Sequence, residues 1–161
     1  MKLCAGCSLH RSRRFPGRFR LPYATHGVTV GVGGNIGEVP ARFDRMVDYL
    51  RRGKRVRLHA LSPLLKNPPF GYTEQPDFYN AVMALSTHLD PMTLLRYLLW
   101  TERRFGRKRS FRDAPRTLDL DIIFYDERRV RTRRLRLPHP AWRQRESVTI
   151  PLMLLEGKRR R

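Results

Sequence analysis

The segment 117–122 constrains the fold of this chain more than any other, because leucine and aspartate alternate along it. Successive side chains of a β-strand point to opposite faces of the sheet. A strand here therefore presents Leu118 and Leu120 to one face, and Asp119 and Asp121 to the other. The apolar face predicts a buried core, and the acidic face predicts a functional site.

The pattern along the rest of the chain predicts an α+β domain. β-Branched and apolar runs predict strands at residues 28–32, 56–65, 78–85 and 118–125. Apolar residues at helical spacing predict helices over 40–53 and 90–106, each with proline in its first turn and glycine at its end. This order is that of a ferredoxin-like split βαβ sandwich, a mostly antiparallel sheet backed by helices. Residues 129–137 favour a hairpin, and residues 148–155 are compatible with a helix or a strand.

Positive charge dominates the composition: 34 Lys and Arg residues against 14 Asp and Glu give a formal net charge of +20. Such a balance predicts attraction to nucleic acid, acidic lipid or a polyphosphate, although a solvated basic surface is the simpler explanation. No acidic residue precedes Glu38. We therefore expect residues 1–26 to form a poorly ordered basic arm, residues 27–157 a single domain, and residues 158–161 a basic tail.

The two cysteines of the chain, Cys4 and Cys7, lie close together near its start. They could be half of a zinc site, a redox pair, or a chance pair, and His10 and His26 could complete a metal site. The sequence has no second cysteine pair and no strand and helix around this one, which argues against zinc-finger and thioredoxin-type motifs. We expect both thiols to be reduced, in a cytoplasmic protein.

The acidic strand face and the basic loop before it together indicate a metal-bound polyphosphate. Two carboxylates about 7 Å apart on one face favour Mg²⁺ shared with substrate phosphates, unless neighbouring arginines neutralise them. The loop brings Arg107, Arg109 and Arg116 to the same end of the sheet. Arginine grips phosphate oxygens through paired N–H donors, although a basic loop serving only solubility or RNA binding has the same composition.

Two further segments have the composition of a ligand site. The glycine-rich run 33–37 matches neither the dinucleotide-binding nor the P-loop pattern, so we interpret it as a tight turn that brings backbone near the site. Segments 67–71 and 78–80 combine prolines, aromatic rings and amides, which suit a planar heterocycle. Packing of Phe70 and Phe78 in the core is an equal alternative. His139, between two prolines, favours a structural or phosphate-contacting role over that of a general base.

Six motifs then occur in one order between residues 28 and 152. They are Gly33-Gly34-Asn35-Ile36-Gly37, Asn67-Pro68-Pro69-Phe70-Gly71, Gln75-Pro76-Asp77-Phe78-Tyr79-Asn80-Ala81-Val82, Phe105-Gly106-Arg107-Lys108-Arg109, Ala114-Pro115-Arg116-Thr117-Leu118-Asp119-Leu120-Asp121-Ile122-Ile123 and Leu137-Pro138-His139-Pro140. Together they closely resemble the 6-hydroxymethyl-7,8-dihydropterin pyrophosphokinase family of folate biosynthesis. The run from Pro115 to Asp121 is the most distinctive of them.

The resemblance implies a ferredoxin-like fold and transfer of pyrophosphate from ATP to the pterin hydroxymethyl group, with release of AMP. It implies two Mg²⁺ ions on Asp119 and Asp121, with Arg107 and Arg116 assisting the transition state. It assigns the ATP contacts to Glu102, Arg109, Arg134, His139 and Arg145, and the pterin pocket to Asn67, Pro68, Phe70, Phe78 and Asn80.

The chain departs from the family pattern at several positions. Leu99 stands where the family often has a glutamine that contacts ATP, and residues 113–114 replace a common Trp-Gly pair. Ser147 takes the place of an aromatic residue that forms the second face of the pterin sandwich. We expect Trp142 or Phe111 to help Phe78 instead.

The main rival interpretation is a basic nucleic-acid-binding module of ferredoxin-like fold without catalysis. The chain lacks the aromatic RNA-binding motif of such sheets, and the central carboxylates would repel a phosphate backbone, so specific nucleic-acid binding is not expected. No stretch approaches the roughly 18 apolar residues of a membrane span, so a membrane partner is not expected either. For the oligomeric state, we favour a monomer.

Overall fold

The computed structural model describes residues 1–157, and the basic tail predicted at 158–161 lies outside that range. The strands are β1 (Ser8–His10), β2 (Gly17–Arg18), β3 (His26–Gly34), β4 (Val56–Leu61), β5 (Leu64–Asn67), β6 (Phe78–Thr87), β7 (Asp119–Tyr125), β8 (Val130–Arg131) and β9 (Arg136–Leu137). The helices are α1 (Val39–Gly53), α2 (Pro91–Arg104), the short 3-10 helix η1 (Trp142–Gln144) and α3 (Glu146–Gly157).

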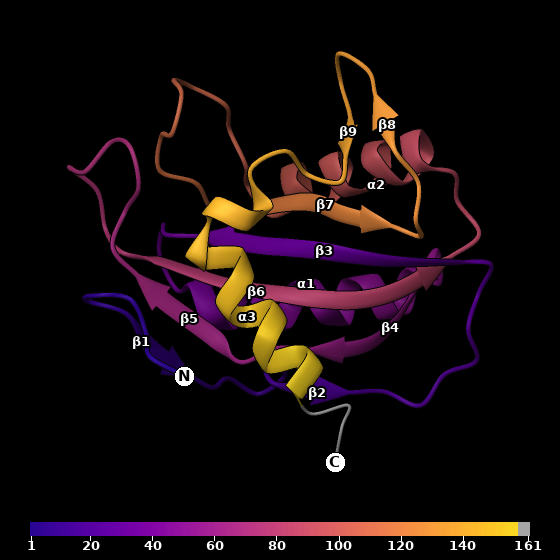
Figure 1. Ribbon diagram of the computed structural model, residues 1–161, viewed down its shortest axis with the longest axis horizontal. Coiled ribbons are helices and arrows are strands. Elements are labelled where there is room, and N and C mark those ends of the chain that lie inside the picture. The colour runs from indigo at the N-terminus through magenta and orange to yellow at the C-terminus, as the bar shows by residue number, and fades with distance from the viewer. Residues whose placement is uncertain (158–161) are drawn as a thin grey trace.

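One antiparallel sheet organises the molecule (Figure 1). Strand β3 lies between β6 and β7, and β6 pairs on its other edge with both β4 and β5. Strands β1 and β2 extend the sheet beyond β5 and β4, and β8 and β9 form the separate hairpin predicted for 129–137. The predicted α+β class with a mostly antiparallel sheet is confirmed.

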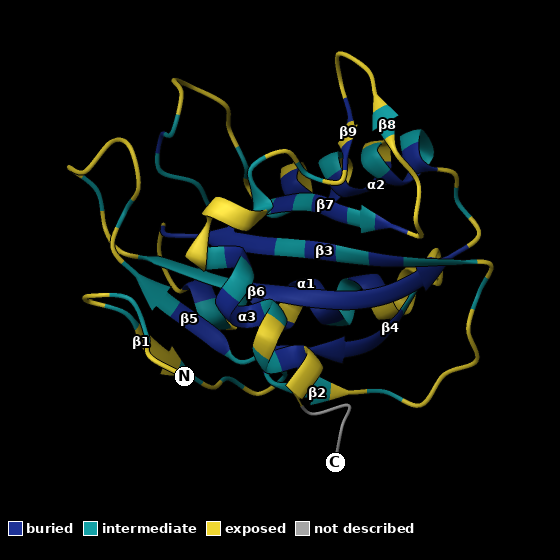
Figure 2. Ribbon diagram, viewed as in Figure 1, coloured by how far each residue is buried: buried dark blue, intermediate teal, exposed yellow. Residues whose placement is uncertain are grey.

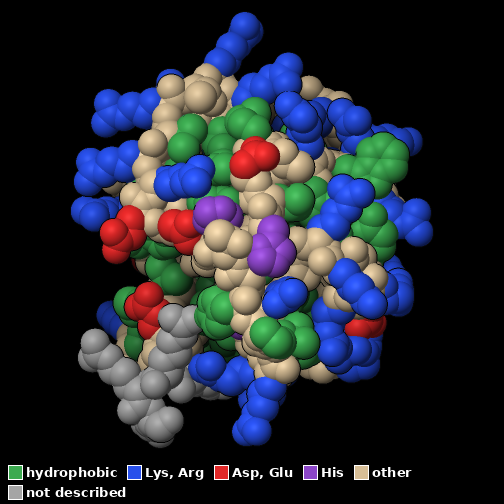
Figure 3. Space-filling model, turned by 90° about the vertical axis from the view of Figure 1, so that its right-hand side faces the viewer, with side chains coloured by type: hydrophobic (Ala, Val, Ile, Leu, Met, Phe, Trp, Pro, Cys, Tyr) green, Lys and Arg blue, Asp and Glu red, His purple; other side chains and the backbone are tan. Residues whose placement is uncertain are grey.

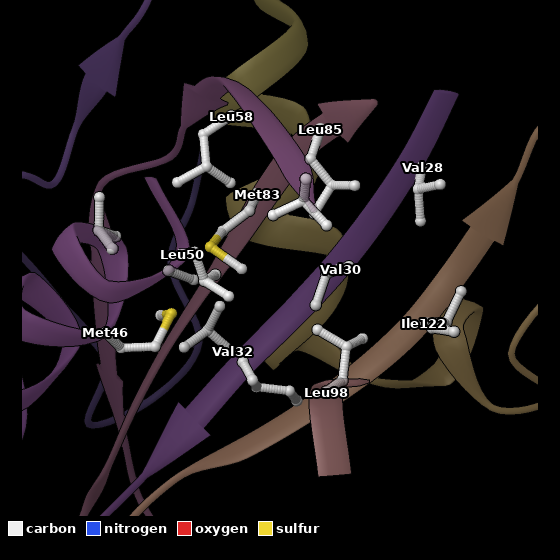
Figure 4. Close-up of a cluster of buried hydrophobic side chains, with 14 of the residues drawn as sticks. Val28, Val30, Val32, Met46, Leu50, Leu58, Met83, Leu85, Leu98 and Ile122 are labelled. Atoms are coloured by element: carbon white, nitrogen blue, oxygen red, sulfur yellow. The ribbon is translucent and has the colours of Figure 1, made fainter. Parts of the chain in front are cut away.

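Helices α1 and α2 cover one face of the sheet, and the main core lies between (Figure 1, Figure 4). Each has a proline in its first turn, and the Asp90 side chain caps α2 by accepting a hydrogen bond from the Thr93 backbone N–H at 3.0 Å. Buried side chains of α1 and α2 form one hydrophobic cluster with the buried Val30 and Val32 of β3. The apolar face of the alternating segment, including Leu120, belongs to this core.

Helix α3 covers the opposite face, near the middle of the sheet (Figure 1, Figure 2). This resolves the open choice at 148–155 as a helix, with Pro151 inside it. A second cluster of buried residues joins α3 to β6 and β7 through Val148, Val82 and Ile123. Because side chains alternate along β7, Asp119 and Asp121 point to the face that carries α3.

The N-terminal segment differs from the poorly ordered arm that the sequence predicted, because it packs against the sheet and α1. Phe15 is 0% exposed and contacts Phe43 of α1 with ring centroids 6.0 Å apart. The buried carboxylate of Asp44 accepts hydrogen bonds from the Ser12 hydroxyl and from two backbone N–H groups of the turn 12–15. One large aromatic side chain and one buried acceptor therefore anchor a segment that has no periodic pattern.

The two cysteines form a disulfide, so the prediction of reduced thiols is wrong for this structure. A turn brings them together: the Cys7 backbone N–H donates to the Cys4 carbonyl oxygen at 3.0 Å, and Gly6 has a φ of +71°. Their Cα atoms are 5.2 Å apart, within the range that a disulfide requires. We call residues 4–7 the cysteine turn.

The surface carries the positive charge. Figure 3 shows one face on which Lys and Arg side chains spread over most of the outline and Asp or Glu side chains are few. None of the helices within residues 1–157 combines the length and apolarity needed to cross a membrane.

Candidate active site

The acidic residues of β7 lie opposite glycines of β3. Asp119 pairs in register with Gly33, and Asp121 with Gly31. A Cβ atom at Gly33 would meet the Asn80 side-chain oxygen at 2.8 Å, so the absence of a side chain there leaves room for Asn80. The glycines of β3 thus keep open the sheet face toward which both carboxylates point.

A cavity of about 470 Å³ lies over this part of the sheet. It brings together nine of the predicted site residues: Asn67, Pro68, Phe70, Phe78, Asn80, Arg116, Asp119, Asp121 and Arg145. Its lining comes in part from the loop after β5, the loop before β7 and the start of α3, segments that can be located in Figure 1. The alternation along β7 therefore correctly predicted that both acids share one open face.

The other five predicted residues lie outside the cavity wall. The Arg107 guanidinium is next to it, 3.2 Å from Asp119, and Arg109 is an exposed partner of Glu102 at 3.6 Å. Glu102 itself is buried behind β7, 2% exposed. His139 is half-buried in the segment between β9 and η1, and Arg134 is exposed in the turn between β8 and β9.

Asp119 and Asp121 have different electrostatic surroundings. Asp119 lies between the guanidinium groups of Arg107 and Arg116, each at 3.2 Å, as the alternative of arginine neutralisation anticipated. Asp121 has no ion pair among residues 1–157. Burial raises the pKa of Asp121, and the negative charge of Asp119 raises it further. A cation held between the two carboxylates would relieve this cost.

The buried Glu102 and the half-buried His139 also have shifted pKa values. Burial raises the pKa of Glu102 to about 7, although its carboxylate accepts a hydrogen bond from the Leu120 backbone N–H at 2.8 Å. Burial, and then the positive charge of Arg145, lower the pKa of His139, which favours its neutral form. A neutral imidazole suits a structural or hydrogen-bonding role.

Asn35 organises the loops around the cavity, which sequence reasoning did not foresee. It is 4% exposed, and its side-chain oxygen accepts from the Arg116 backbone N–H at 2.9 Å. Its amide nitrogen donates to the Gln75 side chain at 2.9 Å and to the Pro76 carbonyl at 3.0 Å. The glycine-rich turn thereby ties two other loops together. The sequence shows an asparagine directly after a pair of glycines, but nothing in it indicates which residues the Asn35 side chain contacts.

The aromatic residues give the cavity one ring face. Phe78 lines it, with the Arg116 guanidinium 5.5 Å from the ring centroid, and Phe70 is 84% exposed at its edge. Trp142 packs edge-on against Phe124, and Phe111 packs against Tyr72, so neither expected substitute lines the cavity. Ser147 does line it.

The cysteine turn is the second feature of the cavity that the sequence did not predict. Cys4, Ala5 and Cys7 line the wall beside Pro68. The contact depends on the pairing of β1 with β5, and a strand of three residues gives no periodic signal.

The donor set suits a hard cation bound together with phosphate. Within residues 1–157, no group of three or more His, Cys, Asp or Glu side chains could hold a metal ion. Two aspartate carboxylates alone leave most of a Mg²⁺ shell to substrate phosphates and water, which is the usual arrangement in phosphoryl-transfer sites.

Comparisons with known proteins agree with this geometry. Residues 29–157 match the model of the family described as 7,8-dihydro-6-hydroxymethylpterin-pyrophosphokinase (HPPK). A 2-amino-4-hydroxy-6-hydroxymethyldihydropteridine pyrophosphokinase of Helicobacter pylori is 42% identical over 147 residues, covering 89% of this chain and 90% of its own. Proteins of the same name from Campylobacter jejuni and Pseudomonas aeruginosa are each 40% identical, covering 78% of this chain and 80% and 77% of theirs.

Proposed function

This chain belongs to the 7,8-dihydro-6-hydroxymethylpterin-pyrophosphokinase family, and from that premise we propose which of its residues carry out the reaction. The reaction transfers the β,γ-pyrophosphoryl group of ATP to 6-hydroxymethyl-7,8-dihydropterin in folate biosynthesis. The hydroxymethyl oxygen bonds to the β-phosphorus, and the bond from that phosphorus to the oxygen bridging the α-phosphate breaks. AMP leaves with the electron pair, and the hydroxyl proton passes to solvent.

The catalytic residues of the proposal are Asp119, Asp121, Arg107 and Arg116. Transfer of this kind depends on positioning and on neutralising phosphate charge, with little need for a strong base. Both guanidinium groups lie at the sheet end that carries the carboxylates, which supports their contact with the transferred group.

Asp119 and Asp121 would hold the Mg²⁺, and we propose two ions, as the resemblance implies. When bound, the metal neutralises phosphate oxygens and orients the transferred group. The raised pKa of Asp121 supports the assignment, because two carboxylates on one strand face are costly without a cation.

The pterin is proposed to bind between the loop after β5 and the start of β6, where the Arg116 guanidinium lies over the Phe78 ring. Its contacts are Asn67, Pro68, Phe70, Phe78 and Asn80. The Asn80 amide donates to the Asn67 side-chain oxygen at 2.7 Å. This hydrogen bond fixes the orientation of both amides, which would then contact the edge of the heterocycle. The proposed ATP contacts are Glu102, Arg109, Arg134, His139 and Arg145.

The rival interpretation of a nucleic-acid-binding module is not favoured by the family match. A cytoplasmic, monomeric enzyme remains our proposal. Fractionation of the source cells and light scattering of the purified protein would test these two points.

The shared open face of Asp119 and Asp121 is the observation that carries the proposal. We expect Asp119→Ala and Asp121→Ala each to lower AMP formation from Mg-ATP and the pterin by at least about a hundredfold. Asp48→Ala is the matched control, since it removes the same charge from α1, far from the cavity, and should keep normal turnover. Near-normal rates in both cavity variants would refute the metal assignment.

A further inference from the structure

The cysteine turn reaches the cavity because of how β1 pairs with β5. The strands are antiparallel, with Ser8 opposite Lys66 and His10 opposite Leu64. Residues before Ser8 therefore continue past the end of β5, alongside Asn67 and the prolines that follow. The register of the edge strand thus directs the turn to this wall of the cavity.

Close packing holds the turn against that wall. A Cβ atom built at Gly6 would lie 3.0 Å from the Pro68 Cγ atom, so backbone and proline ring are already in contact. The positive φ of Gly6 and the disulfide fix the shape of the turn. Cys4, Ala5 and Cys7 then line the same cavity as Phe78 and Asn80.

Within residues 1–157, the aromatic side chains that line the cavity are Phe70 and Phe78. Phe78 offers an aromatic face, whereas Ser147, on the α3 side, is small. Trp142 and Phe111 pack elsewhere. Sulfur atoms are polarisable and pack favourably against aromatic rings, so a disulfide is a suitable wall for a flat heterocycle.

We propose that the cysteine turn is a wall of the pterin-binding part of the cavity, and that its disulfide sets the affinity for the pterin. This inference rests on the proposed function, which assigns the cavity to the pterin. The proposed ATP and metal residues lie on α2, in the loop before β7, on β7 and in the segment 134–145, away from the cysteine turn and β5, so opening the disulfide changes the pterin side alone. Substrate affinity thereby depends on the redox state of the protein.

The first experiment uses the full chain with its disulfide intact and after reduction by a water-soluble phosphine. The disulfide accepts two electrons and two protons and becomes two thiols, while the phosphine takes an oxygen atom from water and becomes the phosphine oxide. Since the sequence contains only two cysteines, no other bond is affected. We expect the KM for the pterin to rise about three- to tenfold, with the KM for ATP and kcat within about twofold.

Two variants complete the test. The double variant Cys4→Ser, Cys7→Ser keeps the size of both side chains, and should show the raised pterin KM whether or not the phosphine is present. Deletion of residues 2–7 keeps β1 and the Phe15 anchor, and should raise the pterin KM at least as much. Thermal unfolding of each variant shows whether the rest of the fold is intact.

The outcomes separate this inference from the proposed function. An unchanged pterin KM in the reduced protein and in both variants overturns it, and so does an equal rise in the KM of both substrates. If the unmodified protein forms no AMP, the proposed function fails. Binding of the unreactive oxidised 6-hydroxymethylpterin, measured by its fluorescence, then decides the inference by the same comparison of oxidised, reduced and variant protein.

Discussion

Arg116 connects three parts of the proposed site through one side chain. Its guanidinium donates to Asp119 at 3.2 Å and to the Ala114 carbonyl at 3.0 Å, and it lies over the Phe78 ring. It therefore orients a metal-binding carboxylate, holds the loop before β7 and borders the pterin site.

Replacement of Arg116 by alanine should lower kcat by about a hundredfold or more, because a preorganised donor to the transferred phosphate is lost. Arg112→Ala is the control, since Arg112 is exposed on the same loop and carries the same charge. Steady-state formation of AMP measures both. Equal losses in the two variants would mean that only the overall charge of the loop matters.

The raised pKa of Glu102 predicts how the stability of the protein depends on pH. Its pKa is about 7 in the folded protein, above the ordinary 4.5, so between these values the folded state binds more protons than the unfolded state. Its contribution to the free energy of unfolding therefore falls as pH rises through this window, by up to about 3 kcal/mol, and is constant above it.

Glu102→Gln keeps an oxygen acceptor for the Leu120 N–H but cannot ionise. Between pH 5 and pH 8, the free energy of unfolding of the natural protein should fall by about 1 to 3 kcal/mol more than that of the variant. Urea unfolding at both pH values measures the difference, and Glu127→Gln, at an exposed position, is the control. Parallel pH dependences for the natural protein and the Glu102→Gln variant would contradict the assignment.

At the scale of the elements, the N-terminal segment depends on α1. Asp44 is buried and accepts three hydrogen bonds from the turn 12–15, whereas Asp48, one turn later, makes only ion pairs nearer the surface. Two aspartates four residues apart on one helix thus have different partners: Asp44 binds the turn 12–15 through buried hydrogen bonds, and Asp48 binds arginines near the surface. The cysteine turn and β1 are continuous with the segment that Asp44 anchors.

Asp44→Ala should lower the free energy of unfolding by about 2 to 4 kcal/mol, because it leaves donors of the turn without an acceptor. Asp48→Ala should cost clearly less, since ion pairs near the surface are screened by solvent. Urea unfolding measures both changes. A loss for Asp48→Ala as large as that for Asp44→Ala would show that charge on α1, rather than the buried acceptor, holds the segment.

Elements with strong periodicity could be predicted from the sequence, and those fixed by long-range contacts could not. Helices α1 and α2 have apolar stripes and terminal signals, and the predicted boundaries agree closely with the structure. The strand predicted at 56–65 is instead two strands, β4 and β5, broken around Pro63, which cannot donate to a ladder. Helix α3 is apolar on most sides, so its period was ambiguous.

The same distinction applies to the site. Alternation along β7 predicted the shared face of Asp119 and Asp121, because that property is local. The contacts of Asn35 with two other loops join residues about 40 and about 80 positions apart, and the contact of the cysteine turn with Pro68 joins residues about 60 positions apart. No local pattern encodes such contacts, so a three-residue strand and a single buried amide escaped prediction.

At the scale of the whole molecule, repulsion between positive charges lowers the stability of the folded state. The formal net charge is +20, and the face in Figure 3 has few acidic side chains among its Lys and Arg residues. Repulsion among surface charges destabilises a compact state, and it weakens when the Debye length falls from about 30 Å at 0.01 M salt to about 3 Å at 1 M.

The melting temperature should therefore rise by several degrees as NaCl increases from about 10 mM to about 1 M, because screening weakens repulsion more than it weakens the few exposed ion pairs. Circular dichroism during heating measures this, with sucrose at equal osmolality as a control for effects unrelated to charge. Tripolyphosphate at the same ionic strength as NaCl should raise the melting temperature further, because we expect it to bind the guanidinium groups of Arg107 and Arg116 beside the cavity. A melting temperature that falls with salt would show that ion pairs such as Arg14 with Asp48 outweigh the repulsion.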